Sequence, residues 1–307
     1  LLMLVWEKKL VLKKYYPDQQ AVFLASAYYA ETRCAARLFG LARAQEPNRV
    51  RNLESLLKKQ KKAFSLTDEQ QSAVRAAVEN RICVITGGPG TGKTTILKAV
   101  LNILGGMGLT CSLAAPTGRA AKRMQEATGT QAATLHRLLE YSYDEDEYNC
   151  YFRRNEENPL DADAVIVDEV SMLDVYLFHN LLKALPEEAR LILVGDADQL
   201  PSVGPGNVMG DIIESEIVPC VKLTHRFRNA GGIADAAYDI LNGKMPETGD
   251  GSFEFRECSS ALEVRELLCA EYEAYTKKGE DVQLIAPIKR TDLGTVALNA
   301  AVRERIN

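Results

Sequence analysis

A glycine-rich run ending in lysine and threonine is the part of this chain whose residue types best fit a chemical task. Residues Gly87–Thr94 read Gly-Gly-Pro-Gly-Thr-Gly-Lys-Thr, which matches the spacing G-x-x-x-x-G-K-[ST] of phosphate-binding loops. The run lies between the short apolar segment Arg81–Thr86 and the helix-like segment Thr95–Leu104. A strand, a glycine turn and a helix N-terminus present successive backbone N–H groups to phosphate oxygens. The sequence therefore predicts a nucleoside triphosphate site.

Two side chains of the loop have individual roles in this prediction. Lys93 can reach the β- and γ-phosphates, and the Thr94 hydroxyl can ligate Mg²⁺. A chance glycine turn is the alternative, and it is disfavoured because the motif and both of its flanks fit together. The predicted ATP-binding residues of the loop are Gly88, Pro89, Gly90, Thr91, Gly92, Lys93, Thr94 and Thr95.

An apolar strand that ends in two carboxylates supplies the second part of a catalytic site. Ala164–Val167 leads directly into Asp168 and Glu169. Adjacent residues of a strand point to opposite faces, so the two carboxylates should have different tasks. Asp168 suits a water-mediated hold on Mg²⁺, and Glu169 suits orienting or deprotonating the attacking water. A solvated strand end is the alternative, but the phosphate-binding loop earlier in the chain favours phosphohydrolase chemistry.

A third strand-like segment, Leu191–Gly195, leads into a polar loop that contains Asp196, Asp198 and Gln199. An uncharged side chain with both donor and acceptor groups can sense a γ-phosphate or hold a water, so Gln199 is a further catalytic candidate. Asp196 and Asp198 equally fit the capping of a turn. Spacing alone leaves the role of Gln199 open between catalysis and loop structure.

Two segments downstream of the loop combine a strand end, a turn and basic residues. Thr117 and the amides of a helix start can bind a backbone phosphate, and Arg119 adds positive charge. An ordinary capped helix with solvated bases is the alternative. Further along, His136 is one of only three histidines, and a lone histidine is more often a packed or capping residue than a contact residue.

The bulk composition sets limits on partners. The chain has 307 residues, and its net charge of −5 gives no overall sign of nucleic-acid binding, so such a site must be a local basic patch. Its seven cysteines form no C-x-x-C pair, which favours reduced structural cysteines in a cytoplasmic protein over zinc ligands. No apolar run is long enough to span a membrane. The chain starts without methionine, which indicates a piece of a longer protein.

From Ala63 the chain alternates strand-like and helix-like segments, the pattern of an α/β fold with a parallel sheet covered by helices. Ligands of such sheets bind at the carboxyl ends of the strands. The segment before Ala63 is expected to be helical. Tyr141–Arg154 is expected to form a protruding β-hairpin, because two aromatic-rich arms flank an acidic turn. The expected strands are Ile82–Thr86, Thr110–Ala115, Ala164–Asp168, Arg190–Gly195 and Val282–Ala286.

The order of these motifs resembles that of superfamily 1B helicases. Their residues are most similar to those of the RecD-like branch, whose members are relatives of the exodeoxyribonuclease V alpha subunit. The resemblance is nearly continuous from Leu66 to about Asn299. It is most specific in Val167–Met172 and Leu193–Gly206. Other matching stretches are Leu66–Val74, Ala115–Ala121, Thr134–Leu139 and Leu223–Arg228.

The resemblance implies roles that the residues alone do not give. Gln70 would contact adenine, Gln199 would couple the nucleotide state to DNA, and Arg228 would be the arginine that meets the γ-phosphate, with Arg226 as its near neighbour. The hairpin would be the pin that splits the duplex, and movement along single-stranded DNA would run 5′ to 3′. The residues implied to line the DNA track are Pro116, Thr117, Arg119, Thr134 and His136.

The resemblance also implies a domain organisation. Residues 1–63 would be the tail of an upstream helical domain, and 64–221 a RecA-like motor domain with a hairpin insert at about 141–157. Residues 222–307 would form the junction and the start of a second RecA-like domain. The later motifs of the family are not present in the sequence, so residues 1–307 alone are expected to bind ATP, hydrolyse it poorly and unwind nothing.

The implied function is an ATP-dependent DNA helicase or translocase motor of DNA repair or recombination, with ATP and Mg²⁺ as cofactors. The expected partners are single-stranded DNA, single-strand/double-strand junctions, and single-strand-binding or recombination proteins. A monomer in the cytoplasm is favoured, with the oligomeric state left open. Two alternatives stay open as well. One is an RNA helicase, because no motif reports on the 2′-OH, and the other is a non-motor ATP switch or accessory subunit.

Overall fold

The computed structural model describes residues 2–16, 19–44, 52–144, 149–225, 231–246 and 251–306. The chain divides into two compact units, Leu1–Asn229 and Ala230–Asn307. The first unit contains the sheet and every candidate site residue that the structure describes.

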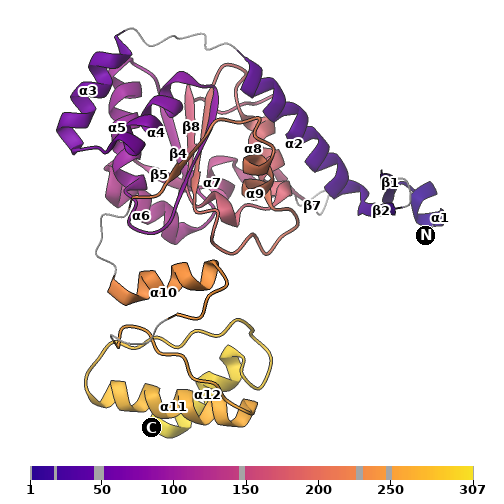
Figure 1. The fold of residues 1–307 in the computed structure, drawn as a ribbon. Helices are drawn as coiled ribbons and strands as arrows, with labels where there is room; N and C mark the ends of the chain where they lie inside the picture. Colours follow the sequence, from indigo (N-terminus) through magenta and orange to yellow (C-terminus); the bar gives the residue numbers. More distant parts are fainter. Residues whose placement is uncertain are drawn as a thin grey trace. The chain divides into compact units, whose positions relative to one another are not determined.

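The centre of the first unit is a six-stranded sheet in which every neighbouring pair is parallel (Figure 1). The strand order is β10-β3-β9-β8-β4-β5. All residues of β3, β8 and β9 are buried, as interior strands are when helices cover both faces of a sheet. The parallel α/β sheet expected from the sequence is therefore confirmed. The strands are β3 (Ile82–Gly87), β4 (Cys111–Ala115), β5 (Ala132–Thr134), β8 (Ala164–Val167), β9 (Arg190–Gly195) and β10 (Cys220–Leu223).

Alternate residues of β3, β4, β8 and β9 enter two separate hydrophobic cores, one on each face of the sheet. On the first face, Cys83 and Ile85 of β3 pack in the same core as Ile192 and Val194 of β9. This alternation follows from the two-residue period of a strand. The helices on this face are α3 (Leu53–Phe64), α4 (Asp68–Glu79), α5 (Lys93–Gly106) and α6 (Gly118–Thr128).

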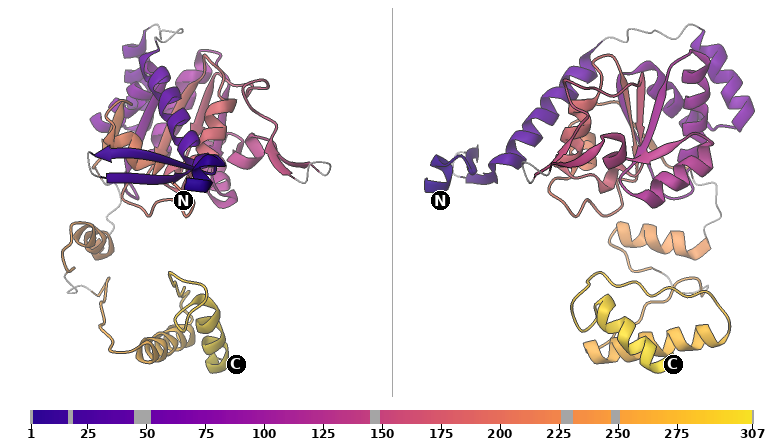
Figure 2. Two further views of the ribbon diagram at one scale, coloured as in Figure 1. Left: turned by 90° about the vertical axis from the view of Figure 1, so that its right-hand side faces the viewer. Right: turned by 180° about the vertical axis from the view of Figure 1, so that it is seen from behind.

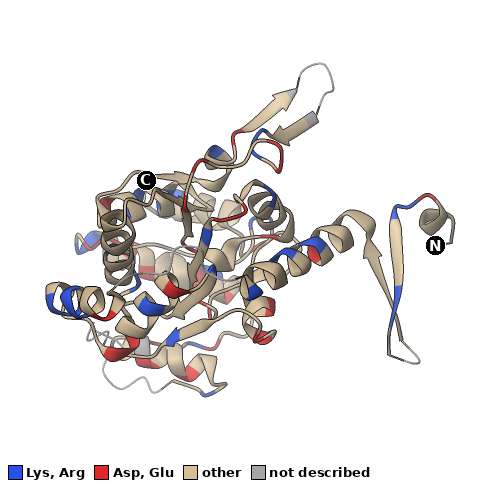
Figure 3. Cartoon of the chain, turned by 90° about the horizontal axis from the view of Figure 1, so that it is seen from above, with Lys and Arg blue, Asp and Glu red and all other residues tan. Residues whose placement is uncertain are grey.

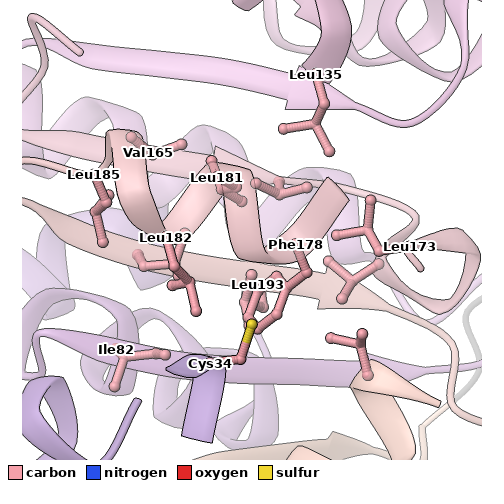
Figure 4. Packing of buried hydrophobic residues seen from close by; sticks show 14 of the residues in the cluster. Cys34, Ile82, Leu135, Val165, Leu173, Phe178, Leu181, Leu182, Leu185 and Leu193 are labelled. Carbon is pink, nitrogen blue, oxygen red and sulfur yellow. The ribbon is translucent and has the colours of Figure 1, made fainter. Parts of the chain in front are cut away.

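The second core lies on the opposite face and contains Ile82 of β3 and Leu193 of β9. Figure 4 shows Phe178 beside Cys34 and Leu193 in this core. Burial, with a smaller contribution from Glu31, raises the pKa of the Cys34 thiol to about 12, so this cysteine acts as a small apolar packing residue. The helices on this face are α2 (Ala25–Arg43), α8 (Val175–Ala184) and α9 (Val208–Glu214), and the short 3-10 helix η1 (Val170–Met172) follows β8.

The N-terminal part differs in one respect from the helical segment expected there. Helices α2 and α3 are present, but a hairpin of β1 (Leu10–Tyr16) and β2 (Gln19–Leu24) follows the short helix α1 (Leu2–Trp6). The valine, phenylalanine and tyrosine residues of the two arms favour strands, and a proline at position 17 is incompatible with a helix interior.

A second hairpin follows α7 (Leu135–Leu138) and projects from the sheet (Figure 2). Strand β6 (Tyr141–Asp144) pairs antiparallel with β7 (Asn149–Phe152), so the hairpin expected from the aromatic-rich arms is confirmed. Residues 145–148 of its turn lie outside the described part of the chain. At its base the Arg154 guanidinium pairs with the Glu140 carboxylate, with a shortest N–O distance of 2.7 Å. This ion pair brackets the hairpin.

The second unit contains α10 (Gly231–Leu241), α11 (Ala261–Lys277) and α12 (Thr295–Ile306). Arg305 of α12 pairs with Glu273 of α11 at 2.8 Å. The prediction of a strand at Val282–Ala286 is wrong, because these residues lie outside regular secondary structure. A parallel strand needs a neighbour to bond with, and no strand occurs among the residues described in this unit.

Charged residues of both signs are spread over the helices and loops (Figure 3), in keeping with the small net charge of −5. Among the helices of the described residues, none combines the length and the apolar character that crossing a membrane requires.

Candidate active site

Strand β3 leads directly into the glycine-rich loop, and α5 begins at Lys93 on the other side of it. Gly90 and Gly92 have φ angles of 78° and 85°, a region that glycine adopts without steric cost. The Thr91 hydroxyl donates to the Gly88 carbonyl at 2.9 Å and so closes the turn. The first amides of a helix have no partner within the helix, which makes the N-terminus of α5 a binding site for an anion held in the loop.

The Lys93 ammonium folds back over the loop. It donates to the carbonyls of Gly87 and Gly88, the latter at 3.2 Å. Phosphate oxygens could take the place of these carbonyls as its partners. The Thr94 side chain is exposed in the first turn of α5, to which Thr95 also belongs, and Pro89 lies in the loop before the helix. The loop thus provides the cation, the hydroxyl and the amides that a nucleotide with Mg²⁺ requires.

Asp168 and Glu169 follow the last residue of β8, as the sequence indicates. Burial raises the pKa of Asp168, while the Glu169 backbone N–H, which donates to its Oδ1 at 2.9 Å, and the Lys93 ammonium act in the opposite direction. Glu169 has a φ of 56°, a left-handed conformation that costs a residue with a side chain about 1–2 kcal/mol.

Strand β9 lies between β3 and β8. The polar loop after β9 therefore lies beside both the glycine-rich loop and the Asp168–Glu169 pair. Asp196 is 4% exposed, and its carboxylate accepts the Asp198 N–H at 3.1 Å. The Ala197 N–H donates to the Thr86 hydroxyl at the end of β3, at 3.0 Å. Asp196 therefore shapes the turn, whereas the Gln199 side chain is exposed at the same edge of the sheet.

The residues expected to contact nucleic acid lie after β4 and β5, which are neighbours in the sheet with Ala115 opposite Thr134. Thr117 caps α6 by accepting the Ala120 N–H at 3.3 Å. Thr134 caps α7 by accepting the Arg137 N–H at 3.2 Å. Two capped helix starts thus stand side by side. Pro116 precedes the first of them at the end of β4, and the side chains of Arg119 and His136 are exposed.

His136 is also part of an aromatic cluster at the foot of the projecting hairpin. Its ring centroid lies 5.4 Å from that of Tyr141 and 5.9 Å from that of Phe152, and the latter two rings are 4.9 Å apart. The two partners are the paired residues nearest the base of β6 and β7. The histidine therefore joins the hairpin to the strand-end edge of the sheet.

The chain is similar in sequence to known proteins. A family model described as an AAA domain matches residues 70–205. An ATP-dependent RecD2 DNA helicase of Deinococcus radiodurans is 38% identical over 251 residues, which cover 79% of this chain and 33% of that protein. The RecBCD enzyme subunit RecD of Mycolicibacterium smegmatis is 39% identical over 196 residues, which cover 55% of this chain and 35% of that protein.

The chain belongs to the RecD-like helicase family. It spans about a third of the length of both RecD-like relatives. Among solved structures, a Pif1 helicase from Candida albicans matches 68% of this chain and 54% of that chain at 18% identity and a TM-score of 0.45. An identity and a TM-score this low do not bear on the function of the RecD-like chain.

Two residues of the RecD-like chain have contacts that the sequence did not indicate, and both lie in the first turn of α4. Gln70 is 3% exposed and forms a capping box with Thr67, while its Nε2 donates to the Thr91 carbonyl in the phosphate loop at 3.0 Å. Both ends of its amide are occupied, and the contact with adenine stays a prediction. The neighbouring Glu69 binds the segment after β10 instead. The spacing Thr-x-x-Gln is a capping-box signature, so this part of the arrangement could have been found from the sequence.

Arg228, the arginine expected to meet the γ-phosphate, lies outside the described residues, as does Arg226. The described part of this RecD-like segment ends at His225, two residues after β10.

Proposed function

We propose that this chain is the ATP-hydrolysing motor core of a DNA helicase or translocase. The observation that carries the proposal is the meeting of the phosphate loop, the Asp168–Glu169 pair and the Gln199 loop on three adjacent strand ends. Similarity to an ATP-dependent DNA helicase and to a RecD subunit supports DNA as the polymer on which the motor acts.

Each residue of the nucleotide side has a physical role in this proposal. Lys93 binds the β- and γ-phosphates, and Thr94 and Asp168 are the residues that would hold Mg²⁺. When bound, Mg²⁺ supplies positive charge that offsets the charge of the phosphate oxygens. Glu169 orients the attacking water and accepts its proton, and Gln199 links the nucleotide state to the nucleic-acid side. Arg228 approaches the γ-phosphate when the motor closes, which makes hydrolysis sensitive to closure.

On the nucleic-acid side, the helix starts capped by Thr117 and Thr134 offer backbone amides to phosphates of a single strand. Pro116, Arg119 and His136 line the same track, and the hairpin separates the strands of a duplex. We assign movement in the 5′ to 3′ direction and residues 64–221 to the first motor domain. Both assignments follow the family, and the exposure of Arg119 and His136 at the strand-end edge supports the track.

The test is ATP hydrolysis by the full-length protein with and without single-stranded DNA, in wild type, Lys93→Ala and Lys98→Ala. Lys98 lies on the same helix, where it lines a separate cavity with Phe64 and Leu101. Strong stimulation by DNA is expected in wild type and Lys98→Ala. In Lys93→Ala the rate of ATP hydrolysis should fall on the order of 10²–10³-fold, which is the scale for the loss of one hydrogen-bond donor to the transition state.

Other polymers and controls separate the alternatives. Stimulation by single-stranded RNA instead of DNA would replace the proposal with an RNA motor. Hydrolysis that ignores both polymers would replace it with an ATP switch. If DNA stimulates hydrolysis, duplexes with a 5′ or a 3′ tail then test the direction of movement, and unwinding only with the 3′ tail would contradict the assigned polarity.

A further inference from the structure

Thr86 is the residue of β3 that precedes Gly87, the first glycine of the glycine-rich loop. It is only 3% exposed, and a buried hydroxyl is costly unless it forms a hydrogen bond. Its Oγ1 accepts the Ala197 backbone N–H at 3.0 Å. One hydroxyl therefore joins the strand before the glycine-rich loop to the loop that follows β9.

This bond continues the contact between two neighbouring strands past the end of their ladder. Thr86 stands opposite Gly195, the last residue of β9, in the last pair between β3 and β9. Ala197 is two residues further on and is exposed. Because Ala197 has left the strand, its N–H binds the Thr86 side chain in place of a backbone carbonyl of β3.

Residues 196–199 form a turn that is closed by its own hydrogen bonds. The Gln199 N–H donates to the Asp196 carbonyl at 3.2 Å, and the Asp198 N–H donates to the Asp196 carboxylate at 3.1 Å. A turn closed in this way moves as one body, so the bond at Ala197 also places the Gln199 backbone. The Gln199 side chain is exposed, and its position relative to the glycine-rich loop depends on the turn that carries it.

The far end of the same loop has a separate anchor at the start of α8. The Val175 N–H donates to the Pro205 carbonyl at 2.9 Å, and a Cβ on Gly204 would stand 2.5 Å from Oδ2 of Asp174. Gln199 is two residues from the first anchor and six from the second. Two residues span at most about 7 Å and six span about 21 Å, so the bond to β3 restricts Gln199 more closely.

We propose that Thr86 is a positioning residue that holds Gln199 in register with the glycine-rich loop. The inference rests on the proposed function, in which Gln199 links the nucleotide state to the nucleic-acid side. A movement of the glycine-rich loop on nucleotide binding reaches Gln199 through one hydroxyl and one short turn. Without the hydroxyl, the exposed turn bonds to water at Ala197 and follows the loop less closely.

The first experiment compares Thr86→Val, Thr86→Ser and Thr128→Val in the full-length protein. Valine removes the acceptor and keeps the branched shape, whereas serine keeps the hydroxyl. Thr128, the last residue of α6, is the matched control, because its hydroxyl also accepts a backbone N–H, that of Thr130 at 3.2 Å. The quantity measured is the ratio of kcat for ATP hydrolysis with and without saturating single-stranded DNA.

Thr86→Val is expected to lower this ratio about 3- to 10-fold, the scale of one hydrogen bond. Its KM for ATP and its kcat without DNA should stay within twofold of wild type. Thr86→Ser and Thr128→Val should keep the wild-type ratio. A Tm within a few degrees of wild type shows that a variant is folded, and Thr86→Ala takes the place of Thr86→Val if the valine variant is unfolded.

Two kinetic outcomes would overturn the proposal. One is a wild-type ratio in Thr86→Val, which would mean that the hydroxyl does not take part in coupling. The other is a raised KM for ATP with an unchanged ratio, which would mean that Thr86 serves the glycine-rich loop alone.

A double-variant cycle with Gln199→Ala decides whether Thr86 acts through Gln199. If it does, Thr86→Val lowers the ratio no further in the Gln199→Ala background, because the hydroxyl has nothing left to position. Losses that multiply in the double variant would count against the proposal. Full stimulation in Gln199→Ala alone would remove the role assigned to that residue and the inference with it.

Backbone hydrogen exchange in residues 196–200 tests the anchor without using hydrolysis. Exchange should be faster in Thr86→Val than in wild type, Thr86→Ser and Thr128→Val, and equal exchange in all four would contradict the inference. If wild-type hydrolysis does not respond to DNA, the motor proposal fails, and the exchange measurement still decides whether Thr86 holds the turn.

Discussion

Gly87 and Leu223 lie opposite each other as the last residues of β3 and β10. A Cβ on Gly87 would stand 2.8 Å from the Leu223 Cβ and 3.0 Å from the Leu223 carbonyl oxygen. The first glycine of the predicted phosphate loop is therefore required by the neighbouring strand. The place where the loop begins and the place where the chain leaves the sheet are in direct contact.

Gly87→Ala should disturb both places. An added methyl that nothing can accommodate costs about 1–3 kcal/mol, so we expect a lower Tm and weaker binding of a fluorescent ATP analogue by tenfold or more. Gly105→Ala is the matched control, since a Cβ there meets nothing within 4 Å. Because Gly105 is the penultimate residue of α5, the change should raise the free energy of unfolding by less than the roughly 0.5–1 kcal/mol of a mid-helix position. Equal nucleotide affinity in both variants would contradict the close packing of Gly87.

Asp168→Asn should make the nucleotide-free protein more stable and inactive. The carboxylate is largely buried, and burial is the main reason that its pKa is raised, so the charge opposes folding at neutral pH. Removing the charge is expected to raise the free energy of unfolding by about 1 kcal/mol, which corresponds to about 2–4 °C in Tm for a protein of this size. Thermal unfolding beside Asp161→Asn, an exposed control, measures the effect. A lower Tm in Asp168→Asn would show that the charge is stabilised by its surroundings.

Glu169→Gly and Glu169→Ala should both lose hydrolysis, but they should differ in stability. Both substitutions remove the proposed general base, and such a base contributes about 10²–10⁴-fold to the rate of hydrolysis. Glu169 has a φ of 56°, and in that region glycine is favoured over alanine by about 1 kcal/mol. Urea unfolding of the two variants tests this, with nucleotide binding retained in both. Equal stability would mean that the backbone relaxes after substitution.

Tyr141→Ala is expected to weaken binding of single-stranded DNA. The ring belongs to the His136–Tyr141–Phe152 cluster, is 49% exposed and stands beside the proposed track. Loss of one stacking ring costs about 1–3 kcal/mol, which is roughly 5- to 150-fold in Kd. Fluorescence anisotropy with labelled oligonucleotides measures it. Tyr29→Ala on α2, with a similarly exposed ring, is the control, and an equal loss there would indicate a nonspecific effect.

Asp163→Asn should destabilise the sheet in a pH-dependent way. Its Oδ2 accepts the Thr110 N–H at 2.7 Å and the Thr110 hydroxyl at 2.8 Å, and these bonds, with Arg190 adding to them, lower its pKa. A lowered pKa contributes stability above the ordinary value near 4, and that stability is lost as the pH falls through the folded-state value. The difference from wild type, about 1 kcal/mol at pH 7, should therefore shrink toward pH 3 in urea unfolding. A constant difference would mean that the charge is not involved.

Local sequence patterns were sufficient to predict the strand, loop and helix around Gly87 and the strand that leads to Asp168. Both stretches combine short apolar segments with fixed polar positions, and such patterns need only neighbours in sequence to be recognised. The aromatic arms around Tyr141 predicted a hairpin for the same reason.

Contacts between distant segments could not be predicted in this way. Nothing near Glu69 in the sequence indicates that it meets Thr224, because that contact depends on β10 taking its place beside β3. The Val282–Ala286 segment has strand-forming residues, but whether it forms a strand depends on a partner elsewhere. Residues 10–24 also contain strand-forming side chains, and they form a hairpin although the segments on both sides of it are helical.

The ion pair between Glu140 and Arg154 closes the base of the projecting hairpin. The two residues that flank it are joined to each other, so the ends of the insert are fixed whatever lies between them. Doubling the length of a closed loop costs only about 0.6 kcal/mol. Changes in the length or sequence of this hairpin should therefore have little effect on the sheet beneath it, so the hairpin can evolve at a different pace from the sheet.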